Sequence, residues 1–146
     1  VRMPSRDATT HWAGGIMDGR GHVTLDSSNA GQFDVSFPAR TGNPDGQTSP
    51  EELLAAAHSS CLAMALSGQL GARGYTASSI DVSAEVTLGQ AAEGGFEISG
   101  IEITLRATVA GIEAGQFAEI AELTERTCPV SKALAGTKIS LDAALG

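Results

Sequence analysis

The stretch that decides the fold is SPEELLAAAHSSCLAMALSGQLGA, residues 49–72. Thr48 or Ser49 suits the N-cap of a helix, and Pro50 suits its first position because an N–H there would have no partner. Ser49 and Glu52 add the S-x-x-E spacing of a capping box. Leucine and alanine then occupy nearly every side of the helix, which is too wide an apolar surface for a helix that faces water. The sequence therefore predicts a long, buried central helix over residues 49–72.

The composition bounds the class of protein. The chain has 146 residues without a break in composition, so we expect a single domain over residues 1–146. The net charge of −8, with only nine lysines and arginines and no basic cluster, argues against a nucleic-acid partner. The N-terminal segment lacks the apolar region of a signal peptide, and no apolar run approaches the ~18 residues of a membrane helix. We expect a cytoplasmic protein with no membrane partner.

Strands and further helices are predicted on both sides of the central helix. Before it, short apolar and β-branched stretches predict three strands and a turn-rich loop, at residues 9–13, 22–27, 32–37 and 39–47. After it, the pattern predicts two long strands, two helices and a last strand, at residues 80–88, 96–109, 113–127, 129–136 and 138–141. The fold class is α+β: an N-terminal three-stranded sheet, the central helix, and a second antiparallel β region with two C-terminal helices.

The second long strand contains a break in its alternation. Phe96 and Ile98 are apolar at even positions, whereas the apolar residues from Ile101 onward are at odd positions. A slip of one residue would turn the later apolar side chains away from the core. We therefore predict a β-bulge near Ser99 and Gly100.

The chemistry of the chain depends on two cysteines, Cys61 and Cys128, which lie in different elements. In a reducing cytoplasm such a pair is a set of inert core thiols, a redox couple or part of a metal site. The inert interpretation is the default, because free cysteine is among the most commonly buried residues. Two features point away from it. Cys128 precedes Pro129 at a helix N-terminus, which favours a thiolate, and Cys61 lies beside polar residues such as His58 in an otherwise apolar helix.

Cys61 needs a cation if it is to be a nucleophile. It lies about three turns into its helix, beyond the reach of the helix dipole, and burial raises the pKa of a thiol. Lowering that pKa from about 8.5 to about 6 requires roughly 3.4 kcal/mol, and one cation at ~4 Å supplies about 4 kcal/mol before desolvation. Arg40, in the loop before the helix, is the best candidate among the arginines.

A buried arginine in turn needs a carboxylate to fix its orientation. At 100° per residue Glu51 projects about 80° from the direction of Cys61, whereas Glu52 projects about 180° away. Glu51 and Cys61 are nevertheless about 15 Å apart along one helix. If both contact one guanidinium, Glu51 must come from a partner chain whose central helix runs antiparallel, which predicts a two-fold dimer.

Three other interpretations remain open. Cys61, His58, Cys128 and His11 could hold zinc, although no C-x-x-C or paired histidine spacing is present. A Cys-His hydrolase would pair Cys61 with His58, but adjacent turns of one helix give poor geometry for proton transfer. His58 is better interpreted as a packed core histidine with one hydrogen-bonded nitrogen. The last alternative is a non-catalytic dimeric binding domain with buried, inert cysteines.

Three stretches resemble one protein family, the OsmC/Ohr group of thiol-dependent hydroperoxide reductases, and within it the OsmC branch. They are HWAGGIMDGRGHVTLDS at residues 11–27, TSPEELLAAAHSSCLAMAL at 48–66 and TCPVSKAL at 127–134. The resemblance implies an intertwined α+β homodimer with the central helix at the interface and two active sites there. Matched residue by residue, it implies that Cys61 is the peroxidatic cysteine, Cys128 the resolving cysteine, Arg40 the activating arginine and Glu51 the glutamate that orients it.

The activity that we expect follows from this resemblance. The Cys61 thiolate attacks a peroxide, leaves a sulfenic acid and condenses with Cys128 to a disulfide, in defence against oxidative or osmotic stress. The resemblance implies an external dithiol or lipoylated-protein reductant, with no bound cofactor and no metal. Apolar residues near Cys61 and in the core would favour organic over hydrogen peroxides; the candidates are Leu62, Met64, Phe33 and Phe37.

Overall fold

The computed structural model describes residues 3–146. They form two compact units, an N-terminal unit that ends at Pro50 and a C-terminal unit, Glu51–Gly146. That the chain folds as the single domain expected from its sequence stays a prediction.

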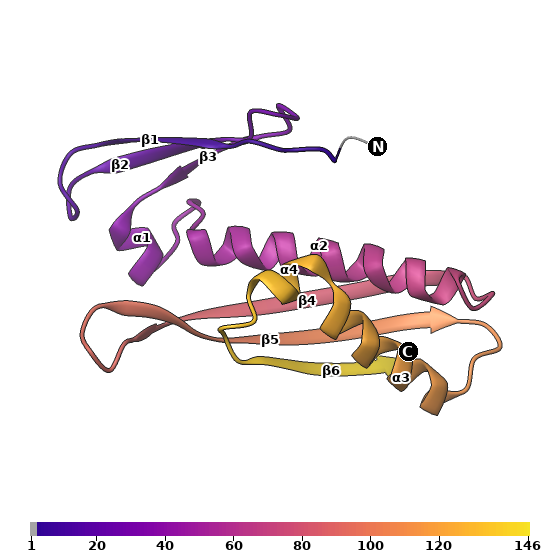
Figure 1. Ribbon diagram of the computed structural model, residues 1–146. Helices are drawn as coiled ribbons and strands as arrows, with labels where there is room; N and C mark the ends of the chain where they lie inside the picture. Colours follow the sequence, from indigo (N-terminus) through magenta and orange to yellow (C-terminus); the bar gives the residue numbers. More distant parts are fainter. Residues whose placement is uncertain (1–2) are drawn as a thin grey trace. The chain divides into compact units, whose positions relative to one another are not determined.

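The N-terminal unit is an antiparallel sheet in the order β1-β2-β3, as Figure 1 shows. Its strands are β1 (Thr9–Ala13), β2 (Arg20–Thr24) and β3 (Gln32–Val35). The bounds of β1 match the prediction. β2 lies two to three residues before its predicted range, because the β1–β2 turn closes tightly through a hydrogen bond of 2.7 Å from Gly19 N to Gly15 O.

A short helix, α1 (Phe37–Thr41), follows β3 where the sequence predicted the end of a strand and then a loop. That prediction was wrong, because local capping prevails over the apolar alternation that extended to Phe37. Ser36 is the N-cap, and its hydroxyl accepts a hydrogen bond of 3.3 Å from Ala39 N. Pro38 lies in the first turn, where its missing N–H costs nothing. Arg40 therefore lies on a helix and not in a loop.

The C-terminal unit is one sheet covered by three helices. Its elements are α2 (Pro50–Gly71), β4 (Ala77–Gln90), β5 (Phe96–Val109), α3 (Ala114–Thr127), α4 (Pro129–Ala133) and β6 (Ile139–Leu145). β4 pairs antiparallel with β5, as predicted. β6 pairs parallel with β5, so the prediction of an antiparallel region was wrong for the last strand. The physical reason is that α3 and α4 form a crossover that returns the chain to the same end of the sheet.

The predicted β-bulge is confirmed. Thr87 pairs with Gly100, whereas the next residue, Leu88, pairs with Ile98. Ser99 is therefore the extra residue of β5, and Ile98 before it and Ile101 after it both pack in the cluster that contains Leu62 of α2.

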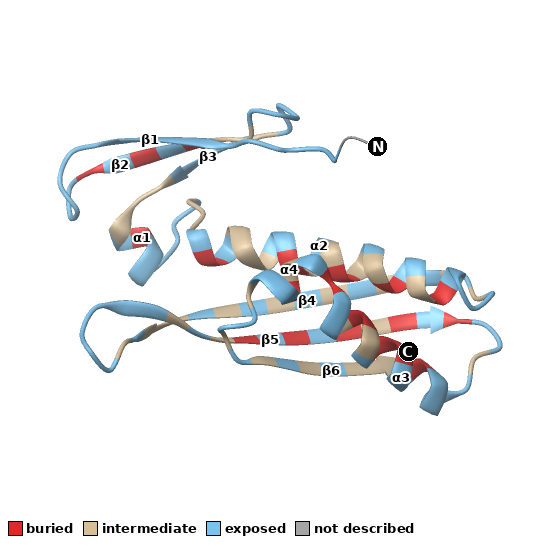
Figure 2. Ribbon diagram, in the orientation of Figure 1, coloured by how far each residue is buried: buried red, intermediate tan, exposed pale blue. Residues whose placement is uncertain are grey.

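All three helices cover the same face of the sheet. Leu66 and Leu70 from α2 and Phe117 and Ile120 from α3 form one buried cluster with β5 residues such as Leu105. Figure 2 shows these buried segments on the sides of α2 and α3 that face the sheet. The opposite face of the sheet is polar and exposed.

The expectation that no apolar run approaches the length of a membrane helix was wrong for α2, which is long and apolar enough by length and composition. Its packing marks it as a core helix, because Leu62, Leu66 and Leu70 are fully buried in the C-terminal unit. Its other side carries exposed side chains, including Met64, which is 71% exposed in the single chain.

Candidate active site

The fold brings the two cysteines together. Cys61 lies in the middle of α2, and Cys128 lies between α3 and α4 with an extended backbone that separates the two helices. Their Sγ atoms are 3.0 Å apart, at hydrogen-bond distance, and both thiols are free. Two thiols in such a position need only a small displacement, together with a two-electron oxidant, to form a disulfide.

The two cysteines differ in their exposure to solvent. Cys128 is fully buried in a cluster with Leu62, Ile101 and Ile103. Cys61 packs against this cluster from its edge and is partly exposed. Cys61 is therefore the more accessible of the two residues to a small molecule from solvent.

The surroundings also separate the acidities of the two thiols. Burial, followed by the hydrogen bond with Cys128, raises the pKa of Cys61. Burial alone would also raise the pKa of Cys128, but hydrogen bonding with Cys61 and with groups of Ser131 and Val130 lowers it overall. The need of Cys61 for a cation, inferred from its depth in the helix, thus has a structural basis.

His58 is fully buried on α2, three residues before Cys61. Its Nε2 lies 2.7 Å from the hydroxyl of Ser131 on α4, whereas its Nδ1 is buried without a hydrogen-bond partner. The prediction of a packed core histidine with one bonded nitrogen is confirmed. Ser131 was missed by the sequence reasoning, although its position three residues after Cys128, in the first turn of α4, is a signal that it faces the sulfur.

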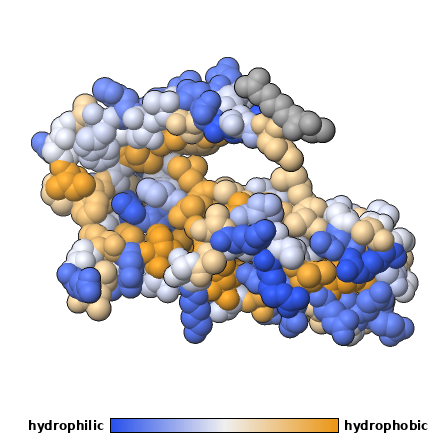
Figure 3. Space-filling model, in the orientation of Figure 1, coloured by the Kyte–Doolittle hydropathy of each residue, from blue (hydrophilic) through white to orange (hydrophobic). Residues whose placement is uncertain are grey.

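Arg40 belongs to the N-terminal unit, where it lines an apolar pocket of about 200 Å³. The other walls of the pocket are Trp12, Ile16, Val35, Ser36, Phe37 and Pro50. Trp12 and Ile16 lie in the stretch at residues 11–27 that resembles the family, but the sequence analysis gave neither residue a role. Ile16 and Met17 are 61% and 65% exposed, and apolar surface is visible at this turn on the left edge of Figure 3.

Glu51 lies in the first turn of α2 and is 7% exposed. It precedes Cys61 by ten residues on a continuous helix, so the two are about 15 Å apart along its axis. Within one chain the structure therefore keeps this carboxylate away from the paired sulfur atoms. Of the four residues proposed from the sequence, Cys61 and Cys128 are in direct contact.

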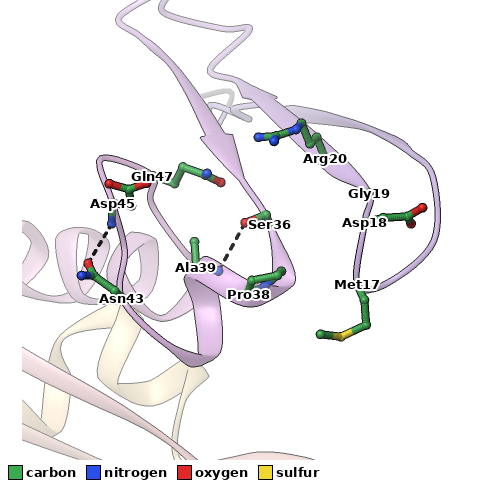
Figure 4. A pocket seen from close by; sticks show the side chains of 10 residues that line it. All are labelled: Met17, Asp18, Gly19, Arg20, Ser36, Pro38, Ala39, Asn43, Asp45 and Gln47. Carbon is green, nitrogen blue, oxygen red and sulfur yellow. Dashed lines mark hydrogen bonds between the residues drawn. The ribbon is translucent and has the colours of Figure 1, made fainter.

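Another pocket of the N-terminal unit is larger and polar, with a volume of about 450 Å³. Figure 4 shows Arg20, Asp18, Asp45 and Gln47 around it, with hydrogen bonds from Ala39 N to Ser36 and from Asp45 N to Asn43. It contains no nucleophilic thiol. Across residues 3–146, no three His, Cys, Asp or Glu side chains are grouped so that they could hold a metal.

A model of the family described as OsmC-like protein matches residues 42–142, which include both cysteines. The chain belongs to this family. Peroxiredoxin OsmC of Escherichia coli (strain K12) is 40% identical to it over 132 residues, 90% of this chain and 90% of the relative. The resemblance inferred from the three sequence stretches is confirmed.

Solved structures support the same OsmC-like fold. An organic hydroperoxide resistance protein from Elizabethkingia anophelis is 28% identical, with a TM-score of 0.78 and 99% of each chain covered. The organic hydroperoxide resistance protein OhrB of Bacillus subtilis is 26% identical, with a TM-score of 0.68 and 96% and 98% of the two chains covered. These neighbours confirm the α+β class predicted from the sequence.

Proposed function

We propose that this OsmC-like protein is a thiol-dependent peroxidase that reduces organic hydroperoxides, and hydrogen peroxide less efficiently, to alcohols or water. The observation that carries the proposal is the distance of 3.0 Å between the sulfur atoms of Cys61 and Cys128. The relatives named Peroxiredoxin OsmC and organic hydroperoxide resistance protein support the class of reaction. A stress-defence role in the cytoplasm follows as part of this proposal.

The reaction begins at Cys61, the accessible thiol. Its thiolate attacks the distal peroxide oxygen, the O–O bond breaks, and the alkoxide leaves with a proton as an alcohol. Cys61 becomes a sulfenic acid, two electrons more oxidised. Cys128 then attacks the sulfenic sulfur, the S–O bond breaks, and water leaves as the disulfide forms. An external dithiol, free or carried as a lipoyl group, restores both thiols without a cofactor bound to the chain.

Arg40 supplies the positive charge in this proposal. Burial raises the pKa of Cys61, so a guanidinium beside the sulfur is required to hold the thiolate near neutral pH. The apolar walls of the pocket around Arg40 would hold the organic group of the substrate, which favours alkyl over hydrogen peroxide. Phe37 is the one of the four apolar candidates from the sequence that lies in this pocket. Leu62 is fully buried in the core, and Phe33 and Met64 do not line the pocket.

Glu51 would orient Arg40 across a homodimer in which two copies of α2 pack antiparallel. The exposed side of α2 supports this arrangement, because apolar Met64 is 71% exposed on it and the small residues around it permit close helix packing. Light scattering tests the dimer directly. Met64→Lys should dissociate it, whereas Glu102→Lys on the outer face of the sheet should not, and a wild-type monomer at micromolar concentration would refute the shared site.

The decisive experiment is a single turnover of the reduced protein with an alkyl hydroperoxide. We expect fast peroxide consumption that is lost in Cys61→Ser. Cys128→Ser is the matched variant, because it should still consume one equivalent of peroxide but leave a sulfenic acid that a dimedone probe captures. Consumption no faster than that of a free thiol would favour the rival, a non-catalytic dimeric binding domain with inert cysteines.

A further inference from the structure

The peroxidase proposal leaves one buried polar group unexplained. His58 is fully buried, and its Nδ1 has no hydrogen-bond partner. A buried polar atom without a partner destabilises the fold, so it needs a compensating role. Its other nitrogen, Nε2, is 2.7 Å from the Ser131 hydroxyl.

The protonation state of His58 follows from its surroundings. Burial lowers its pKa, so the ring is neutral at pH 7 and carries one N–H. With the proton on Nδ1, a buried donor would have no acceptor, which is rarer in proteins than a lone pair without a donor. The proton therefore belongs on Nε2, from which it is donated to the Ser131 oxygen.

The Ser131 hydroxyl can still donate one hydrogen bond of its own. Because its oxygen accepts from His58, its O–H is free to donate. Cys128 is the N-cap of α4 and Ser131 is the third residue of this helix, a spacing at which the later side chain can reach back to the cap residue. Hydrogen bonding with the Ser131 side chain is also among the causes that lower the pKa of Cys128. Ser131 is itself 5% exposed, so water competes little for this bond. A continuous chain of groups results, from His58 through Ser131 and Cys128 to Cys61.

We propose that His58 and Ser131 are positioning residues for the resolving cysteine: the Nε2–H of His58 fixes the Ser131 hydroxyl so that it donates to the Cys128 sulfur and holds it as a thiolate. This inference rests on the proposed peroxidase function, in which Cys128 is the resolving cysteine. The thiolate attacks the sulfenic sulfur of Cys61, the S–S bond forms, the S–O bond breaks, and the hydroxide takes up the proton that Cys128 lost earlier. Cys128 is oxidised and the Cys61 sulfur is reduced by the same electron pair.

The groups that could otherwise control Cys128 are few. From α2 the titratable neighbours are Cys61 and His58, and strands β5 and β6 present the apolar side chains of Ile101, Ile103 and Ile139 to the same cluster. The backbone of Ser131 and Val130 at the start of α4 also favours the thiolate. The hydroxyl of Ser131 is the contribution that a substitution removes without changing the backbone.

The first test measures Cys128 alone, in a Cys61→Ser background, by the ultraviolet absorbance of its thiolate against pH. Ser131→Ala should lower the ratio of thiolate to thiol about fivefold, the loss of one hydrogen bond, and Ser131→Thr should preserve it. His58→Gln, which places an amide N–H near the position of Nε2, should also preserve it. His58→Asn places its amide near Nδ1 and should reduce the ratio as Ser131→Ala does. Unchanged titration in Ser131→Ala, or equal behaviour of His58→Gln and His58→Asn, overturns the inference.

A second measurement uses the unmodified protein and does not depend on how the variants fold. Nitrogen-15 NMR of the His58 ring should report the neutral tautomer with its proton on Nε2 at pH 7. A proton on Nδ1, or an imidazolium, overturns the inference. Neither measurement uses peroxide, so a failure of the peroxidase proposal, seen as no peroxide consumption, is distinguishable from a failure of this one.

Discussion

The sulfur atoms of Cys61 and Cys128 lie 3.0 Å apart although 67 residues separate them in the chain. One cysteine is partly exposed on a long helix, and the other is buried at the junction of two helices. The partly exposed thiol is accessible to a reagent from solvent. The buried thiol lies close enough to react with the oxidised form of the first, a sulfenic acid in the proposed reaction.

Formation of the disulfide should stabilise the protein. A crosslink that closes a loop of 67 residues restricts the unfolded chain and contributes about 4 kcal/mol. We expect a higher urea midpoint for protein oxidised with one equivalent of alkyl hydroperoxide than for reduced protein. The urea midpoint of Cys128→Ser should not rise under the same treatment. Equal midpoints for the oxidised and reduced wild-type protein would contradict the prediction.

Replacement of Arg40 should slow the first chemical step. Arg40→Met removes the charge that stabilises the Cys61 thiolate, and we expect oxidation by alkyl hydroperoxide to slow by roughly 10²–10³-fold. Arg40→Lys should be intermediate, because lysine keeps the charge but not the planar fork. Stopped-flow rates measure this, with Arg20→Met, at the separate polar pocket, as the control. Oxidation rates for Arg40→Met equal to those of wild type would show that Arg40 is not part of the active site.

Two glycine substitutions should have opposite effects on stability. A Cβ at Gly89 would lie 2.8 Å from the Cβ of Ser99, the bulged residue, so Gly89→Ala should destabilise by about 1–3 kcal/mol. A Cβ at Gly115 on α3 meets no atom within 4 Å, and Gly115→Ala should stabilise by up to about 1 kcal/mol. Urea unfolding measures both; a neutral or stabilising effect of Gly89→Ala would show that the bulge does not constrain β4.

His22 should make the N-terminal sheet sensitive to pH. Its Nδ1 lies 2.9 Å from Asp34 and its Nε2 2.8 Å from Gln32, so the doubly protonated ring donates to both, and these hydrogen bonds, first that with Asp34, raise its pKa above 6.5. This contribution to stability is fully present below about pH 6.5 and is lost as pH rises through the folded-state pKa. NMR titration of His22, and unfolding followed by the single tryptophan, Trp12, measure it. Asp34→Asn should lower the pKa and flatten the pH dependence; an unchanged titration in that variant would contradict the prediction.

Local signals were sufficient for much of the fold. The S-x-x-E start of α2, the spacing of apolar residues in α3 and the phase slip in β5 each lie within one element. The sequence therefore predicted these helices and the bulge at Ser99 correctly. Where two local signals competed, as between the alternation through Phe37 and the cap at Ser36, the sequence reasoning chose wrongly and missed α1.

Long-range relationships were decided by the tertiary structure. The parallel pairing of β6 depends on where the α3–α4 crossover returns the chain, which periodicity does not encode. The bond between His58 and Ser131 joins positions 73 residues apart and appears only when α2 and α4 pack together. The sequence by itself determined that Cys61 lies too deep in its helix for the dipole to activate it. Only the packing of α2 against the α3–α4 junction brought Cys128 beside it, because contact between distant residues depends on how elements pack and not on their local preferences.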